Sequence, residues 1–259
     1  MKQGNQQEIY VRILDYSKAF DGVNHELMSK VLEKMGIPTH LIVLIKMLYM
    51  NQEAMVRISA GETEWFTLHK GVRQGCILSP RLFNMYTEYI MRAAEIDELN
   101  IGIRIGGRRI SNLRYADDTT IIAENEQDLK KLVNKIADKS NEAGLKLNLK
   151  KTTFMTTGEA NSIVIRGEEI KMVDKVNYLG VTIKRNGNIT EEIKRRIVLG
   201  KIATQKLQKF INDAGISLRT KKQLIETMIY PIVLYGCESW TTRVADKRKL
   251  DSLEMWLWR

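Results

Sequence analysis

Cysteine is nearly absent from this chain of 259 residues, which contains only Cys76 and Cys237. The two lie far apart, and neither belongs to a CxxC or His-paired arrangement. The sequence therefore indicates neither a disulfide framework nor a zinc site. The three histidines, His25, His40 and His69, show no spacing typical of metal ligands.

Long apolar runs and prolines are also scarce. No apolar run approaches the roughly 20 residues that span a bilayer, and the chain has three prolines. With 44% apolar and 28% charged residues, the composition is that of a globular protein with one large or two modest domains. We expect a soluble intracellular protein, nuclear or cytoplasmic, with no membrane partner.

Acidic residues are outnumbered, because 41 Lys and Arg face 31 Asp and Glu and give a net charge of +10. The excess lies in residues 184–259, with 16 basic and 8 acidic residues (net +8), whereas residues 1–183 have 25 and 23 (net +2). Such a surplus favours a polyanionic partner such as nucleic acid. On charge alone, a solvated helical face that keeps the protein soluble explains it equally well.

Apolar periodicities predict an α+β fold over residues 1–186, with a βαββαβ-like antiparallel sheet and packed helices. The predicted strands share a period of two, and they cover residues 9–15, 54–58, 64–68, 111–114, 119–123, 163–166, 169–172 and 178–183, with a further hairpin turned at 106–107. The predicted helices share an apolar stripe, and they follow the N-caps Asn24 and Ser79 and cover about 40–50 and 129–140. From 187 to 259 only helical periods remain, with one stripe from Ile193 to Phe210. This part is predicted to be an all-helical, basic domain.

Two adjacent carboxylates, Asp117 and Asp118, stand at the tip of the hairpin predicted at 111–123. Their repulsion raises the free energy of the tip unless a cation neutralises it, and Mg²⁺ prefers such hard oxygen ligands. Asp15, at the end of another strand, is a third carboxylate that can face this tip across the sheet. Two metal ions about 4 Å apart would then activate an attacking oxygen and stabilise the leaving one. Taken alone, an Asp-Asp pair at a hairpin is more often an ordinary turn.

Five motifs occur in an order that favours the metal site over an ordinary turn. They are LDYSKAFD at 14–21, GVRQGCILSP at 71–80, YADD at 115–118, GLKLNLKKT at 144–152 and YLG at 178–180. The series resembles motifs A to E of reverse transcriptases, and the first and last are similar in spelling to those of non-LTR, LINE-type retrotransposons. The resemblance runs from about residue 9 to the C-terminus. It implies a reverse-transcriptase palm over residues 1–186 and a helical thumb over 187–259.

The resemblance implies an RNA-directed DNA polymerase, which transfers a nucleotide from a dNTP to the 3′-OH of a DNA primer on an RNA template. Two Mg²⁺ ions, with Mn²⁺ as the alternative, would be its cofactors. Asp15 and Asp117 would be their essential ligands, assisted by Asp118 and by the carbonyl of Tyr16. Lys151, or the lysine before it, would protonate the pyrophosphate or neutralise its charge, unless both are solvated surface residues.

Further residues would shape the nucleotide and primer sites. The ring of Phe20 would pack under the incoming sugar and exclude a 2′-hydroxyl, unless it is a core residue. Gln74 and Gly75 would pack on the nascent base pair, where glycine permits close approach of the backbone. Arg73 would act electrostatically nearby or be a surface residue. The turn at 178–180 would grip the primer end.

The fingers segment that precedes motif A in this family, with the basic residues that hold the triphosphate, has no counterpart before residue 9. We therefore expect a fragment or decayed copy of a longer product, which polymerises weakly by itself. A catalytically inactive relic that only binds nucleic acid is the alternative. Metal-dependent primer extension distinguishes the two.

Overall fold

The computed structural model of the protein describes residues 8–59, 61–116, 118–148, 153–159 and 162–258. The chain forms two compact units, residues 1–173 and 174–259, and each is described by itself. None of the described helices is both long and apolar enough to cross a membrane.

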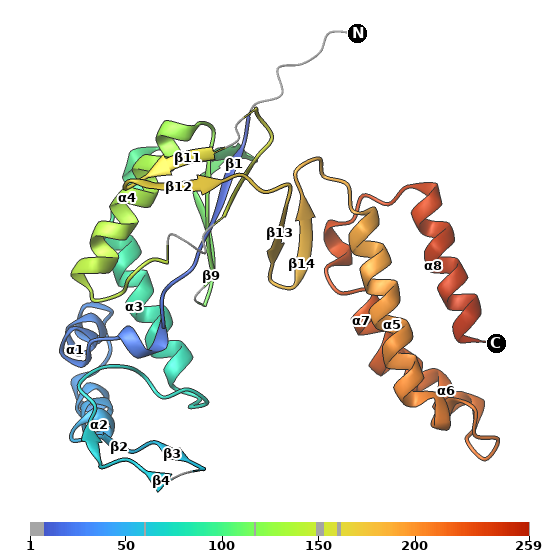
Figure 1. Cartoon of the computed structure of the whole chain (residues 1–259), viewed down its shortest axis with the longest axis horizontal. Coiled ribbons are helices and arrows are strands. Elements are labelled where there is room, and N and C mark those ends of the chain that lie inside the picture. Colours follow the sequence, from blue (N-terminus) through green and yellow to red (C-terminus); the bar gives the residue numbers. More distant parts are fainter. Residues whose placement is uncertain (1–7, 60, 117, 149–152, 160–161, 259) are drawn as a thin grey trace. The chain divides into compact units, whose positions relative to one another are not determined.

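A four-stranded antiparallel sheet is the centre of the first unit (Figure 1). Its order is β10-β1-β9-β8, and its strands are β1 (Tyr10–Leu14), β8 (Asn112–Tyr115), β9 (Asp118–Ala123) and β10 (Phe154–Thr156). The central strands β1 and β9 are rich in apolar and β-branched residues, which suit a sheet interior. The predicted mixed fold with an antiparallel sheet is confirmed.

One face of this sheet packs against α4 (Glu126–Glu142), and the same core reaches the end of α3 (Ser79–Ala93). Tyr10 and Leu14 of β1 and Ile121 of β9 join Leu132 and Ile136 of α4 in one buried cluster. Alternate residues of a strand share one face, and apolar residues every three or four positions share one side of a helix, so the apolar face of the sheet packs against the apolar side of α4.

A second core joins α3 to α1 (His25–Lys34) and α2 (Thr39–Tyr49). α1 begins as predicted, because the Asn24 side chain accepts a hydrogen bond from the Leu27 N–H at 2.9 Å. The predicted N-cap of α3 is wrong by one residue, since Leu78 is the N-cap and Ser79 is already helical. Pro80 lies in the first turn, where its missing N–H removes no helical hydrogen bond.

Short elements complete the first unit. The hairpins are β2 (Glu53–Ala54) with β5 (Phe66–Thr67), β3 (Arg57–Ile58) with β4 (Gly61–Glu62), β6 (Ile103–Ile105) with β7 (Arg108–Ile110), and β11 (Ser162–Ile165) with β12 (Glu168–Lys171). Two 3₁₀ turns are η1 (Phe20–Gly22) and η2 (Asp97–Leu99). The hairpin predicted around 106–107 is confirmed.

The second unit combines one hairpin with helices (Figure 1). Its elements are β13 (Lys175–Tyr178), β14 (Val181–Lys184), α5 (Thr190–Ile211), α6 (Leu218–Leu224), the π-helix η3 (Ile225–Ile229), α7 (Tyr230–Val233), the 3₁₀ turn η4 (Cys237–Ser239) and α8 (Val244–Leu257). The single strand predicted at 178–183 is wrong. Leu179 and Gly180 have φ of +48° and +77°, so the chain reverses there.

The buried side of α5 also differs from the predicted stripe. Ile193 and Gly200 are buried, but Phe210 is 55% exposed. Glu192 and Arg196 are buried instead. A search for apolar periodicity cannot find this side of the helix, because charged residues that neutralise one another occupy part of it.

Arg12 is an unusual member of the first unit's interior. On β1 it lies opposite Ile121 and Phe154, and it is fully buried. Within the described part of the chain, none of its three guanidinium nitrogens has a hydrogen-bond partner. Burial lowers the pKa of Arg12 to about 10, because the charged form loses its hydration. Burial of Arg12 therefore destabilises the fold, whereas burial of its apolar neighbours stabilises it.

We predict that Arg12→Leu leaves the free energy of unfolding unchanged or raises it by about 1 kcal/mol or more, because it removes a buried charge that has no hydrogen-bond partner among the described residues. Leu14→Ala, on the same strand and the same face, is the control and should lower the free energy of unfolding by about 2–5 kcal/mol. Urea unfolding measures both variants. A marked loss of stability in Arg12→Leu would contradict the prediction.

Candidate active site

The pairing of β1 with β9 brings two carboxylates together at one end of the sheet. The ladder between β1 and β9 ends at the pair Leu14 and Thr119, and Asp15 directly follows Leu14 while Asp118 directly precedes Thr119. Directly opposite residues share a face of the sheet. Leu14 and Thr119 are buried, whereas Asp15 and Asp118 are exposed. The two carboxylates therefore lie at the same, exposed end of the β1–β9 ladder.

Tyr115 lies at the same end of the sheet, on the neighbouring strand β8. It lies opposite Asp118, and 66% of its surface is exposed. Asp117, the other ligand predicted at this hairpin tip, lies outside the described residues. The described residues hold no cluster of three His, Cys, Asp or Glu side chains. Asp15 and Asp118 nevertheless fit a hard divalent cation, because both present carboxylate oxygens on an open surface.

The segment after α4 runs beside the residues that follow Asp15. The Asn148 N–H donates to the Asp15 carbonyl at 2.7 Å, and the Ser17 N–H donates to the Lys146 carbonyl at 2.8 Å. Tyr16 forms a bridge with residue 147 between these two bonds. This part of the predicted motif D is thus attached directly to motif A. Both lysine candidates, at 150 and 151, lie outside the described residues.

Tyr16 is fixed through its side chain as well. Its ring is buried, and its hydroxyl lies 3.1 Å from the Ser140 hydroxyl of α4. Burial raises the pKa of Tyr16, so the phenol stays neutral. The metal role predicted for Tyr16 concerns its carbonyl, and a buried ring anchors the backbone on which that carbonyl lies.

The predicted motif B loop docks on the turn that follows Asp15. The Gly71 N–H donates to the Val23 carbonyl at 2.7 Å, and the Val72 N–H donates to the Phe20 carbonyl at 2.8 Å. Gly71 has a φ of +99°, and a Cβ there would lie 3.3 Å from the Asp21 Cα. Only glycine combines this backbone conformation with so close an approach.

The predicted nucleotide-site residues lie near this contact. The half-buried Phe20 ring stacks on Phe83, with centroids 4.9 Å apart and planes 17° apart. Arg73, Gln74 and Gly75 are exposed, and the Arg73 guanidinium donates to the Leu48 carbonyl at 3.3 Å. Arg73 and Gln74 line a cavity of about 520 Å³ beside the loop. The structure thus brings the backbones of 20–23 and 71–72 together, while the Phe20 ring is engaged with the core.

Sequence analysis missed the residues that hold the turn at 178–180 in the second unit, which are Glu192, Arg195, Arg196 and Tyr235. Glu192 and Arg196 are buried, and Tyr235 donates to the Leu179 carbonyl at 2.8 Å. The i,i+4 spacing of Glu192 and Arg196 is a weak signal, because such pairs are common on exposed helices. Tyr235 carries no signal, since its contact lies 56 residues away in the sequence.

Comparison with known proteins gives one matching family and several relatives. The family "Reverse transcriptase (RNA-dependent DNA polymerase)" matches residues 1–183. A Pol polyprotein of a type-1 R2 retrotransposable element from Nasonia vitripennis is 27% identical over 96% of this chain. That of a type-2 R2DM element from Drosophila melanogaster is 26% identical over 94%. The chain spans 25% and 23% of the lengths of these two relatives.

A solved structure has a similar fold. Telomerase from Candida tropicalis, in complex with a fragment of telomeric RNA, matches with a TM-score of 0.56 and 15% sequence identity. The match covers 99% of this chain and 50% of that one. At this identity the likeness concerns the fold alone.

The contact between the two motif segments predicts a specific sensitivity at Gly71. Gly71→Ala should lower the free energy of unfolding by about 1 kcal/mol more than Gly107→Ala, which costs about 1–2 kcal/mol for its left-handed backbone alone. Gly107 has a φ of +81° with nothing within 4 Å of an added Cβ, so it is a matched control. Urea unfolding measures the difference, and equal losses in the two variants would contradict the docking.

Proposed function

The chain belongs to the reverse transcriptase (RNA-dependent DNA polymerase) family, and from this premise we propose that it carries the active site of an RNA-directed DNA polymerase of retrotransposon origin. The observation that supports this most is the register of β1 and β9. It ends at Leu14 and Thr119, the sequence neighbours of Asp15 and Asp118, and both of these carboxylates are exposed. Nucleotidyl transfer uses such carboxylates, because metal ions held between them can also reach substrate phosphates.

In the proposed reaction, the primer 3′-oxygen attacks the α-phosphorus of a dNTP, and the bond from that phosphorus to the bridging oxygen breaks. Pyrophosphate leaves with that oxygen. Two divalent cations, Mg²⁺ or alternatively Mn²⁺, would lower the pKa of the primer 3′-hydroxyl and neutralise the charge of the phosphates. Asp15, Asp117, Asp118 and the carbonyl of Tyr16 would hold them. Lys151 would protonate or neutralise the leaving group.

The proposed nucleotide site lies where motif A meets motif B. The hydrogen bond from Val72 to Phe20 joins the two segments. Phe20 would exclude a 2′-hydroxyl, and its stacking on the core would keep the ring in one orientation. Gln74 and Gly75 would pack on the nascent base pair, and Arg73 would attract the triphosphate.

The proposed partners are an RNA template and a DNA primer. The net +8 of residues 184–259 is suited to phosphate contacts, which dominate the affinity of proteins for nucleic acids. A telomerase of similar fold was solved with telomeric RNA, in keeping with an RNA template. We assign a palm to residues 1–186 and a thumb to 187–259. This assignment gives the hairpin of β13 and β14 to the palm, although the hairpin lies in the same compact unit as the helices.

Loss of a metal ligand provides the first test of the function. Asp15→Asn and Asp117→Asn keep the shape of the side chain but remove its charge, and they should reduce Mg²⁺-dependent primer extension on RNA by on the order of 10²-fold or more. Asp97→Asn, at an exposed position in η2, is the control and should leave extension unchanged. Mn²⁺ binding to the 259-residue chain, followed by electron paramagnetic resonance, should weaken in the first two variants only. Unchanged extension in Asp15→Asn would reject the site, and nucleic-acid binding without extension would favour the inactive relic.

Salt dependence tests the basic surface. Lys206 and Lys209 are exposed on α5, and replacing both by Gln should reduce the slope of log affinity for an RNA–DNA duplex against log salt by about 1.4–1.8. The same replacement of Lys30 and Lys131, exposed in the first unit, is the control for charge alone. Fluorescence anisotropy between low and high salt measures both. Equal changes in the two double variants would contradict a thumb-centred duplex site.

A further inference from the structure

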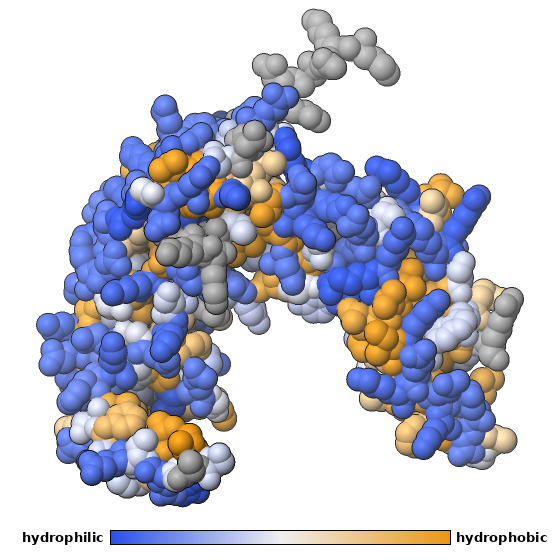
Figure 2. Space-filling model, in the orientation of Figure 1, coloured by the Kyte–Doolittle hydropathy of each residue, from blue (hydrophilic) through white to orange (hydrophobic). Residues whose placement is uncertain are grey.

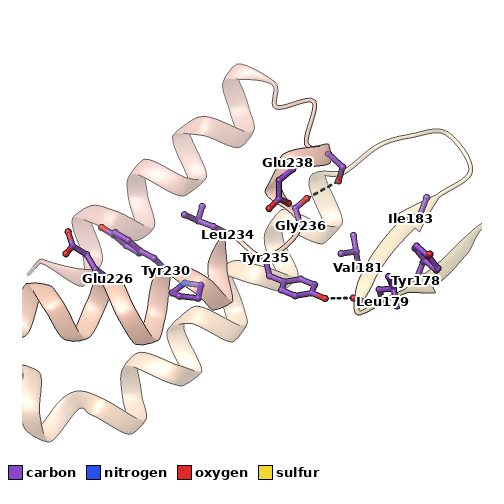
Figure 3. A pocket seen from close by; sticks show the side chains of 12 residues that line it. Tyr178, Leu179, Val181, Ile183, Glu226, Tyr230, Leu234, Tyr235, Gly236 and Glu238 are labelled. Atoms are coloured by element: carbon purple, nitrogen blue, oxygen red, sulfur yellow. Dashed lines mark hydrogen bonds between the residues drawn. The ribbon is translucent and has the colours of Figure 1, made fainter. Parts of the chain in front are cut away.

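The turn between β13 and β14 is held by side chains at both of its central carbonyls. The Leu179 carbonyl accepts a hydrogen bond from the Tyr235 hydroxyl at 2.8 Å, as Figure 3 shows. The Gly180 carbonyl accepts from Arg195 Nη2 and Arg196 Nη2, each at 2.5 Å. Carbonyls at a tight turn usually face water, so capture of both by charged or phenolic donors is a specific arrangement.

Glu192 organises the two arginines. Glu192 is 2% exposed, and its carboxylate accepts from Arg195 Nε at 2.8 Å, from Arg196 Nε at 2.7 Å and from the Thr182 N–H of β14 at 3.1 Å. Burial alone would raise the pKa of Glu192, but these hydrogen bonds outweigh it and lower the pKa to about 2. The carboxylate is therefore charged at any physiological pH, and it fixes helix α5 to the hairpin.

Tyr235 is fixed in turn by Arg196. The Arg196 guanidinium carbon lies 4.4 Å from the centroid of the Tyr235 ring, which is a cation–π contact. The next residue, Gly236, has a φ of +76°, and a Cβ there would lie 2.8 Å from Val181 Cγ2. The hairpin is thus gripped from α5 and from the segment at 235–236.

A cavity of about 840 Å³ lies beside this contact, within the second unit. Tyr178, Leu179, Tyr230 and Tyr235 are among its lining residues (Figure 3). Figure 2 shows an apolar patch where α5 and α7 overlap in this view, and Leu234, directly after α7, is among the exposed apolar side chains. The hairpin is therefore not held by continuous packing on this side, and the polar contacts determine where its tip lies.

We propose that Glu192, Arg195, Arg196 and Tyr235 form a clamp of positioning residues that sets the orientation of the turn at 178–180, and with it the primer terminus. The inference rests on the proposed function, in which this turn contacts the primer end. None of the four residues touches the reacting atoms. They act through the backbone of Leu179 and Gly180, so their loss should alter use of the primer and leave dNTP binding unaffected.

Tyr235→Phe is the sharpest test. It removes the hydroxyl that binds the Leu179 carbonyl and keeps the ring beneath Arg196. We expect the KM for primer–template to rise about three- to tenfold, the loss typical of one hydrogen bond, with the KM for dNTP within about twofold. Tyr230 lines the same cavity but has no contact with the turn carbonyls in the described structure. Tyr230→Phe is therefore the control and should change neither the KM for primer–template nor the KM for dNTP.

A second pair of variants separates positioning from folding. Arg196→Lys keeps a charge that can reach Glu192 or Gly180, so it should retain more primer affinity than Arg196→Met. Amide hydrogen exchange at residues 178–183 follows the turn without any substrate. Exchange there should be faster in Tyr235→Phe and Arg196→Met than in the unaltered protein, while α4 exchanges as before.

Primer extension and amide exchange together distinguish failure of the proposed function from failure of the clamp. If the unaltered protein does not extend primers, the proposed function fails, and exchange at 178–183 still decides whether the clamp exists. If exchange there is the same in Tyr235→Phe, Tyr230→Phe and the unaltered protein, the clamp is overturned. If Tyr235→Phe raises the KM for dNTP as much as that for primer, the positioning role is overturned.

Discussion

The geometry of the candidate site depends on the antiparallel pairing of β1 with β9. A shift of one residue in this register would turn Asp15 toward the α4 core and Leu14 away from it. Both changes raise the free energy, because a carboxylate would lose its hydration and a buried leucine its packing. Burial of Tyr10 and Leu14 against α4 therefore fixes the register. The same apolar contacts that stabilise the first unit therefore place Asp15 and Asp118 at the exposed end of this pair of strands.

Main-chain hydrogen bonds attach the other motif segments to this pair of strands. The bonds from Asn148 to Asp15 and from Val72 to Phe20 join segments that are far apart in the sequence. Every residue except proline has a backbone N–H, so such contacts tolerate changes of most side chains. Gly71 is an exception, because its backbone approaches Asp21 too closely for a Cβ. This construction is in keeping with a fold shared with a telomerase at 15% identity.

Much of the first unit could be predicted from periodicity, because β1 and α4 each bury one regular face. The roles of the candidate carboxylates stay predictions from the motif order, and Asp117 and Lys151 lie outside the described residues. The turn at 179–180 was missed because the run from 178 to 183 alternates like one strand, and only Gly180 signals a reversal. The buried side of α5 was missed because Glu192 and Arg196 look like an exposed pair until their partners, the Thr182 N–H and the Gly180 carbonyl, are known.

These partners explain why a charged pair occupies that side of α5. Apolar residues of equal volume could pack α5 against the hairpin, and such replacements of buried ion pairs are often no less stable. They could not accept a hydrogen bond from the Thr182 N–H or donate one to the Gly180 carbonyl, however, and both groups would lose partners on this side. Apolar residues would hold the hairpin against α5 without defining the direction of its tip. The charged residues form hydrogen bonds with individual backbone groups of the hairpin, so they fix the orientation of the hairpin as well as its contact with α5.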